Sequence, residues 1–528
     1  MTSPAALQSS APSIIAVAHS LRAALALLAV TGLAACAQLQ PRPVLPVTAA
    51  APPGTTTRLD QFIAAAEGRH AGQSGFRLVK EGPEAFVIRA QSAKLADRSL
   101  DVQTYIWHAD LTGAFIAHQV LEAADRGVKV RLLVDDMDAR AKNAGFAALG
   151  AHPNIQVRLY NPFASREGTA SMVGEGLTSF GRINHRMHNK TWIADNRIAV
   201  AGGRNIGDEY FGASDEVNFV DLDFAMIGQV VRDASSSFDR YWNAPAAYPI
   251  EVLDPEHVTA KALEALRARL ATAPDDPAAA RYAAALRADD AVNRLIAGDW
   301  PLQWSATYRF ISDDPMKATL KEGDPERTQV ATELVPMLRA AQSGITIISP
   351  YFVPGEKLTA GLVESAGQGK RVRILTNSLA ANDVAAVHGG YSRYRKTLVA
   401  GGVEVWELKP AAGGTKSSLK GSSGASLHTK ALTVDGRTLF VGSYNLDPRS
   451  TWLNCEQGVL VESPVLAHEL EQIFDQQATA QRAWQVTLKG GDLSWSDGKQ
   501  IFDNDPMATA GRRFQAWFAR VFHLDAQL

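Results

Sequence analysis

Two copies of one short pattern carry the side chains best suited to chemistry in this chain. The first copy begins at His188 and the second at His428, and both read His-x-Lys-x-x-x-x-Asp. The copies lie 428 − 188 = 240 residues apart, which indicates that a functional half has been duplicated. The pattern supplies six candidate catalytic residues: His188, Lys190, Asp195, His428, Lys430 and Asp435.

Small and polar residues follow each copy, with the first glycine and the asparagine at the same offset in both. Glycine allows the backbone to approach a ligand closely, and asparagine and serine side chains offer hydrogen bonds. The candidates for binding a phosphate group are Gly202, Asn205, Gly442, Ser443 and Asn445.

Together the two patterns suit the chemistry of a phosphodiester. Two ammonium groups and two amides would hold its non-bridging oxygens. One imidazole would attack phosphorus, and the other would protonate the leaving oxygen and then deprotonate the incoming hydroxyl. Asp223 and Glu456, which open the apolar strands after the motifs, are expected to orient the imidazoles. Because the lysines supply the positive charge, no metal and no cofactor are expected.

The predicted elements around each copy have the same order. Residues 99–135 and 343–377 each read as strand, helix and strand, which predicts a parallel unit in each half. The motif then lies on a strand, where the i, i+2 spacing puts histidine and lysine on one face. Asp195-Asn196 and Asp435-Gly436 read as hairpin turns, so both aspartates are expected to support the fold more than the chemistry. We predict an α/β fold of two halves, each a mixed, mostly parallel sheet flanked by helices, meeting at one active site about a pseudo-twofold axis.

The same patterns divide the chain into six segments. We predict a signal peptide over 1–35, a flexible tether over 36–57, a first half over 58–250, a helical connector over 251–317, a second half over 318–485 and a C-terminal extension over 486–528. Residues 304–317 are expected to lead into the second half and to pack across both. Residues 413–426 are rich in Gly, Ser and Lys and are predicted to form a mobile loop. The basic and aromatic stretch 512–522 is expected to pack on the core, with an interfacial helix as the alternative.

The N-terminus has the pattern of a bacterial lipoprotein signal. Residues 23–35 are apolar, and this run is too short for a membrane span, which needs roughly 20 residues. The sequence Leu33-Ala34-Ala35-Cys36 resembles a lipobox, which implies that Cys36 is lipidated. The protein would then be held at a membrane of the cell envelope, facing the periplasm, with inner or outer membrane left open. A plain secretory signal with a chance cysteine is the alternative.

Composition limits the other classes of function. The 528 residues carry a formal net charge of −2, which gives no general field to attract nucleic acid, so no nucleic-acid partner is expected. The two cysteines, Cys36 and Cys455, lie in unrelated contexts, which disfavours a disulfide. No cluster of Cys and His has the spacing of a zinc site.

At the two motifs the sequence resembles the phospholipase D superfamily, whose members carry two such patterns. The resemblance covers nearly the whole chain from about Gly75, and residues 102–113, 186–190, 202–211 and 349–354 resemble the C-type subgroup of bacterial cardiolipin synthases. It implies a phosphatidyl-histidine intermediate, with His188 as the nucleophile by analogy, and transfer of the phosphatidyl group to phosphatidylglycerol. Phosphatidylethanolamine is a further candidate substrate, and a functional monomer is expected. Membrane-embedded cardiolipin synthases begin with spanning helices, whereas here a lipobox takes their place.

Three alternatives stay open at this point. Phospholipase D hydrolysis to phosphatidic acid would share the covalent first step and replace the alcohol by water. A secreted phosphodiesterase or nuclease would use the same site, but the near-neutral charge and the anchor count against it. A catalytically inactive envelope protein is disfavoured, because both His-Lys-Asp sets and both asparagines are intact.

Overall fold

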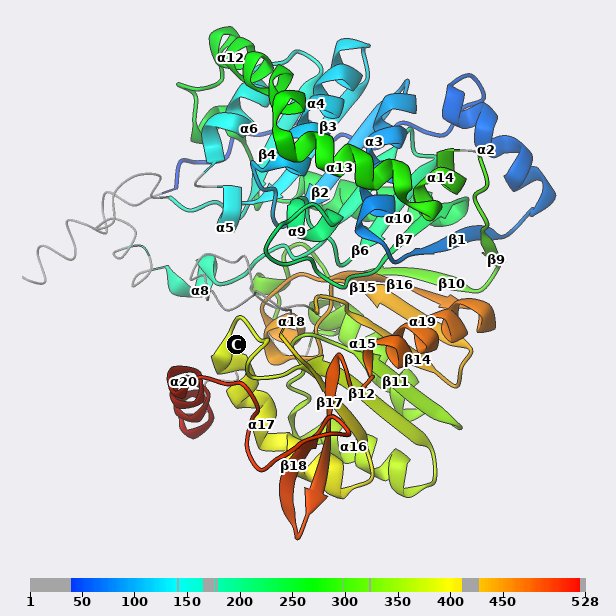
Figure 1. The fold of residues 1–528 in the computed structure, drawn as a ribbon. Helices are drawn as coiled ribbons and strands as arrows, with labels where there is room; N and C mark the ends of the chain where they lie inside the picture. The colour runs from blue at the N-terminus through cyan, green and yellow to red at the C-terminus, as the bar shows by residue number, and fades with distance from the viewer. Residues whose placement is uncertain are drawn as a thin grey trace, which may run out of the picture.

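The structure is a computed structural model, and it describes residues 39–139, 142–164, 175, 179–296, 298–321, 324–410 and 427–522. The predicted signal peptide, Cys36 and the predicted mobile loop 413–426 lie outside these ranges. The described chain forms two α/β halves, each built on one large sheet, which lie one above the other in Figure 1.

The sheet of the first half has nine strands in the order β8-β4-β3-β2-β5-β6-β7-β1-β9. Only β2, β3 and β4 run parallel to one another, and the other neighbours pair antiparallel. The sheet is therefore mixed, as predicted, with a smaller parallel part than expected. The strands are β1 (Ser74–Val79), β2 (Ser99–Thr104), β3 (Lys129–Asp135), β4 (Ile155–Tyr160), β5 (Thr191–Ala194), β6 (Ile198–Gly202), β7 (Asp223–Ile227), β8 (Ala247–Pro249) and β9 (Gln303–Ser305).

The sheet of the second half repeats this plan with ten strands in the order β10-β16-β15-β14-β11-β12-β13-β17-β18-β19. Here β11, β12 and β13 form the parallel part. The strands are β10 (Tyr308–Ser312), β11 (Gly344–Ile348), β12 (Arg371–Asn377), β13 (Glu404–Leu408), β14 (Ala431–Val434), β15 (Thr438–Gly442), β16 (Gln457–Glu462), β17 (Ala483–Lys489), β18 (Asp492–Ser496) and β19 (Ile501–Phe502).

Helices flank both sheets. In the first half they are α2 (Arg58–Arg69), α3 (Gly82–Leu95), α4 (Leu111–Asp125), α5 (Asp136–Ala139), α6 (Asn143–Gly150), α8 (Phe180–Ile183), α9 (Asp208–Phe211) and α10 (Gln229–Asn243). In the second half they are α15 (Gln329–Arg339), α16 (Gly355–Gly367), α17 (Ala385–Ala400), α18 (Pro448–Trp452), α19 (Pro464–Gln477) and α20 (Ala510–Val521). The crossover helix α4 begins at Leu111, because Asp110 caps it by accepting a hydrogen bond from the Gly113 amide.

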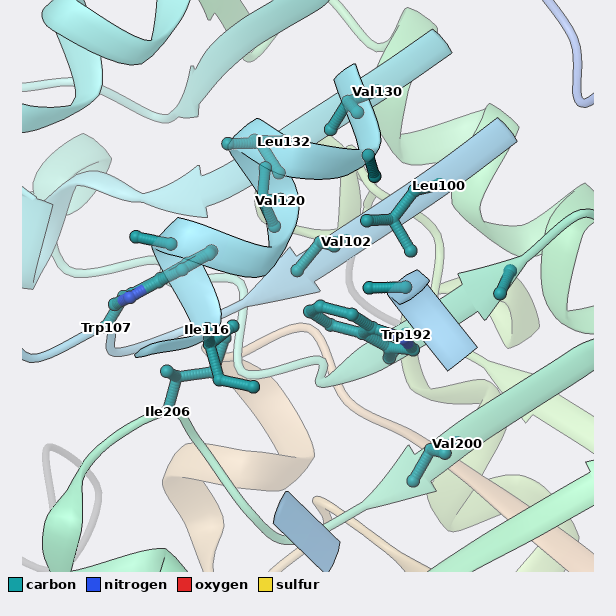
Figure 2. Close-up of a cluster of buried hydrophobic side chains, with 14 of the residues drawn as sticks. Leu100, Val102, Trp107, Ile116, Val120, Val130, Leu132, Trp192, Val200 and Ile206 are labelled. Atoms are coloured by element: carbon teal, nitrogen blue, oxygen red, sulfur yellow. The ribbon is translucent and has the colours of Figure 1, made fainter. Parts of the chain in front are cut away.

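Most buried apolar side chains of the described residues pack into one cluster within each half and one that joins them, and a small fourth cluster contains Leu379, Ala385 and Ala516. Figure 2 shows part of the first cluster, where side chains of β2, β3, α4 and β5 meet around Trp192. The joining cluster contains residues of both halves, among them Met187, Leu427 and Cys455. These residues lie beside the two motifs, so the packing that joins the halves also fixes the position of one motif relative to the other.

The connector links the halves with more than helices. It consists of α11 (Ile250–Leu253), α12 (Ala260–Ala271), α13 (Pro277–Ala288) and α14 (Asp290–Ile296), followed by β9 and β10. β9 pairs with β1 of the first sheet, and β10 pairs with β16 of the second. The segment expected to pack across both halves thus adds one strand to each sheet.

Residues 39–57 contain no helix or strand, but they do not form the flexible tether that was predicted. Arg42 Nε donates a hydrogen bond to the Ala247 carbonyl (2.7 Å), and the Thr48 amide donates to Asn243 Oδ1 (3.1 Å). The segment is rich in Pro, Ala and Thr, as a linker is, but it forms hydrogen bonds with groups of the first half.

The C-terminal extension begins inside the second sheet, because β17 pairs with β13. Its last helix, α20, packs against α17, where a Cβ on Gly389 would lie only 2.4 Å from the Ala516 carbonyl oxygen. The expected packing on the core is therefore confirmed for this face of α20. None of the helices in the described ranges combines the length and apolar character that crossing a membrane requires.

Candidate active site

Each His-x-Lys segment lies just before a strand of its own half and pairs with the opposite half. β5 begins at Thr191 and β14 at Ala431, so the motif residues precede the strands that were predicted to carry them. The His188 amide donates to the carbonyl of Cys455, and the His428 amide to that of Val220, at 2.9 Å each. The segments leave their own sheets because their hydrogen bonds go across the boundary between the halves.

The ends of two parallel strands hold these segments in place. Asp135, the last residue of β3, accepts hydrogen bonds from the Met187 amide (2.7 Å) and from Arg186 Nη1 (3.1 Å). Asn377, the last residue of β12, donates to the Leu427 carbonyl (3.2 Å). The site therefore lies at the carboxyl ends of the parallel strands of both sheets.

A buried carboxylate of the opposite half binds the Nδ1 of each motif histidine. Glu456 Oε2 lies 2.9 Å from His188 Nδ1, and Asp221 Oδ2 lies 2.6 Å from His428 Nδ1. Both carboxylates are fully buried. Each histidine that donates its Nδ1 proton in this way keeps the lone pair of Nε2 for chemistry.

The prediction that Asp223 orients a histidine is wrong. Its carboxylate accepts from Arg89 Nη2 (3.0 Å) and from the Arg204 amide (3.2 Å). Strand register explains the error, because Gly202 pairs with Asp223 whereas Gly442 pairs with Gly458. The residue that corresponds to Glu456, two positions before Gly458, is therefore Asp221. The sequence 221–223 carries two acidic residues, and only the register separates their roles.

The small residues after the motifs contact neighbouring segments of the chain, and their role in binding a phosphate group stays a prediction. Ser443 Oγ donates to Glu456 Oε2 (2.5 Å), so it braces the carboxylate that holds His188. A Cβ on Gly202 would lie 2.5 Å from the Leu222 carbonyl oxygen, and one on Gly442 would lie 2.3 Å from that of Gln457. These glycines permit close contact with the neighbouring chain segment.

The two asparagines differ. Asn205 Oδ1 accepts from the Ile106 amide (3.2 Å), and its Nδ2 donates to the Tyr210 hydroxyl (2.9 Å). Asn445 Oδ1 is buried and has no hydrogen-bond partner among the described residues. Asn205 therefore bonds to neighbouring protein groups, whereas the Asn445 side-chain oxygen can still accept a hydrogen bond.

The aspartates that end the motifs lie away from the histidines. Asp195 accepts hydrogen bonds from the amides of Arg98 (2.7 Å) and Ser99 (2.9 Å), and Asp435 does the same for Ser343 (2.7 Å). Both lie beyond the far end of a four-residue strand and five residues from the motif lysine, on the order of 16 Å away. Each aspartate anchors the start of the neighbouring strand, so they support the fold, and counting them as catalytic was wrong.

Aromatic rings that sequence reasoning missed surround the histidines. The ring of Tyr105 meets His188 edge-on at 5.1 Å between centroids, and Tyr210 meets His428 in the same way at 5.3 Å. Phe219 stacks on His428 at 5.4 Å. Tyr105 directly follows β2, and the end of a parallel strand is the signal that could have identified it.

Burial and mutual repulsion lower the pKa values of the four histidine and lysine side chains of the motifs. Burial lowers the pKa of Lys430 to about 8 and that of Lys190 well below its ordinary value. Burial and the nearby Lys430 lower the pKa of His428 to about 4, and burial with both lysines lowers that of His188 well below its usual range. The charges of both lysines lower the pKa of each histidine, so the two His-Lys pairs lie in one site. Both imidazoles are neutral near pH 7 in this site.

Two further groups of His and carboxylate side chains lie within the described ranges. His108 Nδ1 is 3.1 Å from Glu209 Oε1, with Asp110 nearby. The other group, His388 with Glu407 and Asp505, already encloses a cation, because Arg395 Nη1 donates to both carboxylates at 2.8 Å. Neither group includes a motif histidine.

Comparisons with known proteins assign the family. The family model described as "Cardiolipin synthase, PLD-like domain" matches residues 89–242 and 334–478, one range in each half. Cardiolipin synthase C of Escherichia coli (strain K12) is 41% identical over 437 residues, which are 81% of this chain and 90% of that protein. An uncharacterized protein of Helicobacter pylori (strain ATCC 700392 / 26695) is 31% identical over 443 residues, 83% of this chain and 86% of that protein.

A solved structure shares the fold. The phosphatidylserine synthase of Haemophilus influenzae Rd KW20 aligns with a TM-score of 0.57 and 14% identity, over 88% of this chain and 99% of that chain. The family match covers both halves, and the 41% identity extends over most of the chain. The chain therefore belongs to the cardiolipin synthase family, whose members carry the phospholipase D-like domain.

Proposed function

We propose that this protein is a phosphatidyltransferase that makes cardiolipin through a covalent phosphohistidine intermediate. The observation that carries the proposal is the reciprocal pair of Asp221 with His428 and Glu456 with His188, which leaves two Nε2 atoms free in a site with two lysines. The identity to cardiolipin synthase C supports the lipid substrate.

In the first step, His188 Nε2 forms a bond to phosphorus and the bond to the leaving alcohol oxygen breaks. His428 gives a proton from Nε2 to that oxygen. In the free site His428 is neutral near pH 7. The negative charge of a bound phosphodiester raises the pKa of His428 and so favours its protonated form.

In the second step, His428 takes the proton of the acceptor hydroxyl. The acceptor oxygen then forms its bond to phosphorus, and the bond between phosphorus and His188 breaks. The acceptor we propose is a hydroxyl of phosphatidylglycerol, and the donor is a second phosphatidylglycerol or phosphatidylethanolamine. Lys190 and Lys430 offset the charge on the non-bridging oxygens in both steps.

The reaction would take place at a membrane. Lipidation of Cys36 would hold the protein at the cell envelope with the site facing the periplasm, and one chain supplies both halves of the site, which supports a functional monomer. No metal or cofactor enters the proposed steps.

The test is to incubate the purified protein with phosphatidylglycerol, alone and with phosphatidylethanolamine, and to separate the lipid products. Cardiolipin that is lost in His188→Ala and in His428→Ala supports the proposal. Phosphatidic acid as the only product would favour phospholipase D hydrolysis, which shares the first step. DNA cleavage without lipid turnover would overturn the lipid assignment in favour of a phosphodiesterase.

A further inference from the structure

We propose that α20 is a membrane-docking helix, which lays its exposed aromatic face on the surface of a phospholipid bilayer and holds the active-site rim against it. This inference rests on the proposed lipid substrate, and it assigns a surface that the catalytic site does not use.

The inner face of α20 is made of small residues. Ala516 and Ala519 are buried, and the backbone of Ala516 lies directly on Gly389 of α17. Small residues on both helices let the backbones come close together.

The outer face of α20 carries the large apolar side chains. Each of these side chains is between 40% and 62% exposed, and they are Phe514, Trp517, Phe518, Val521 and Phe522. The aromatic rings contact one another, with centroids 5.8 Å apart for Phe514 and Trp517 and 4.4 Å apart for Phe518 and Phe522. Scattered exposed apolar residues are ordinary, but a contiguous group on one helix face marks an interaction surface.

The charge of α20 matches a phospholipid surface. The helix contains Arg512, Arg513 and Arg520 and no acidic residue. A helix with aromatic residues on one face and arginines beside them is typical of segments that lie in the interface of anionic bilayers.

Hydrogen bonds fix α20 at the rim of the site. Arg512 Nη1 donates to the carbonyls of Leu379 and Asn382, in the loop that follows β12. In the same loop, Asp383 accepts a hydrogen bond from the Tyr351 hydroxyl (2.6 Å), and its charge raises the pKa of Lys430 against the effect of burial. The helix and the catalytic lysine are thus linked through one short loop.

The N-terminal end of the described chain supports the same orientation. Arg42 is held on the first half, and Cys36 lies six residues earlier, so the two are at most about 20 Å apart along the chain. In Figure 1 the start of the described chain, α8 and α20 all lie along the left edge. A lipid anchor at Cys36 and α20 would therefore contact a bilayer on the same side of the molecule.

The test uses the intact protein on vesicles of equal parts phosphatidylglycerol and phosphatidylcholine. A photoreactive amino acid is placed at Trp517 and, as a matched control, at Phe62, which is 57% exposed on α2 at the opposite edge of Figure 1. We expect crosslinks to phospholipid at position 517 to exceed those at position 62 by about tenfold, since an interfacial helix buries this face in the headgroup region. Equal yields at the two positions, or crosslinks at 517 only to a second copy of the chain, would overturn the proposal.

A second measurement separates docking from chemistry. Trp517→Gln with Phe518→Gln removes two exposed rings, so the melting temperature should not change. We expect turnover on these vesicles to fall about tenfold or more, because burying one large apolar side chain is worth at least that factor, while turnover in detergent micelles stays the same. An equal loss in vesicles and micelles contradicts docking. If the wild type shows no turnover in either vesicles or micelles, the proposed function is wrong. The crosslinking result then still decides whether α20 contacts the bilayer.

Discussion

Asp221 Oδ2 lies 2.6 Å from His428 Nδ1, although the two residues belong to opposite halves of the chain. The same arrangement holds for Glu456 and His188 at 2.9 Å. Each half thus supplies one histidine and the carboxylate that orients the histidine of the other half. A site built in this way needs both halves, which accounts for the retention of both motifs in one chain.

Asp221→Asn should lower kcat about 10³- to 10⁴-fold, by analogy with the loss seen when the orienting aspartate of a serine protease triad is changed in this way. An amide at this position no longer fixes the Nδ1–H tautomer of His428. The measurement is the initial rate of lipid turnover.

Asp223→Asn is the matched control, two residues away. Its carboxylate is buried against Arg89 and Arg204, so the change should lower the free energy of unfolding by about 3–5 kcal/mol, as for other broken buried ion pairs. The folded fraction should keep its kcat within about threefold. If Asp223→Asn removed activity and Asp221→Asn did not, the assignment would be reversed.

Ser443→Ala should reduce kcat about 10- to 100-fold, because a hydrogen bond to a charged group contributes about 1.5–3 kcal/mol. The hydroxyl donates to the carboxylate of Glu456, and that carboxylate orients His188. If instead Ser443 bound the phosphate, the apparent Kd for sulfate would weaken in the variant. Calorimetric titration with sulfate distinguishes the two roles, and we expect an unchanged Kd.

Anion binding should weaken as the pH rises through about 8. Burial lowers the pKa of Lys430 to about 8, so below this pH the ammonium is charged, and above it the charge is lost. Sulfate keeps its charge over this range, so calorimetric titration at several pH values isolates the lysine. Lys430→Met should bind sulfate weakly at every pH and remove the step near pH 8. A step of the same size in this variant would assign the titration to another group.

Asp195→Asn should destabilise the fold without removing chemistry. The carboxylate accepts backbone hydrogen bonds from Arg98 and Ser99, and losing part of this set should cost about 3 kcal/mol in the free energy of unfolding. Denaturant unfolding with the kcat of the folded fraction checks this. His188→Ala, as the converse control, should remove activity at nearly unchanged stability, and a catalytic role for Asp195 would instead give both variants the same loss of kcat.

The duplicated spacing was enough to predict the two-half fold and the histidines and lysines of the site, because a repeated motif fixes its elements locally. The orienting carboxylates were harder to predict from the sequence, because Asp221 and Asp223 differ only in strand register, and register depends on the partner strand. The pairing of His188 with Cys455 across the halves could not be read from either repeat alone. The docked segment 39–57 was missed because its composition is that of a linker, and only its contacts to Ala247 and Asn243 show otherwise.

The stereochemistry at phosphorus tests the central claim most directly, namely that two histidines from opposite halves share one phosphoryl transfer in two steps. The substrate is phosphatidylglycerol with a phosphorus atom made chiral by one sulfur substitution, and the configuration of the cardiolipin formed is determined. Attack by histidine followed by attack of the acceptor inverts phosphorus twice, so we expect retention of configuration. Inversion would show direct transfer between the lipids and would contradict a covalent histidine intermediate.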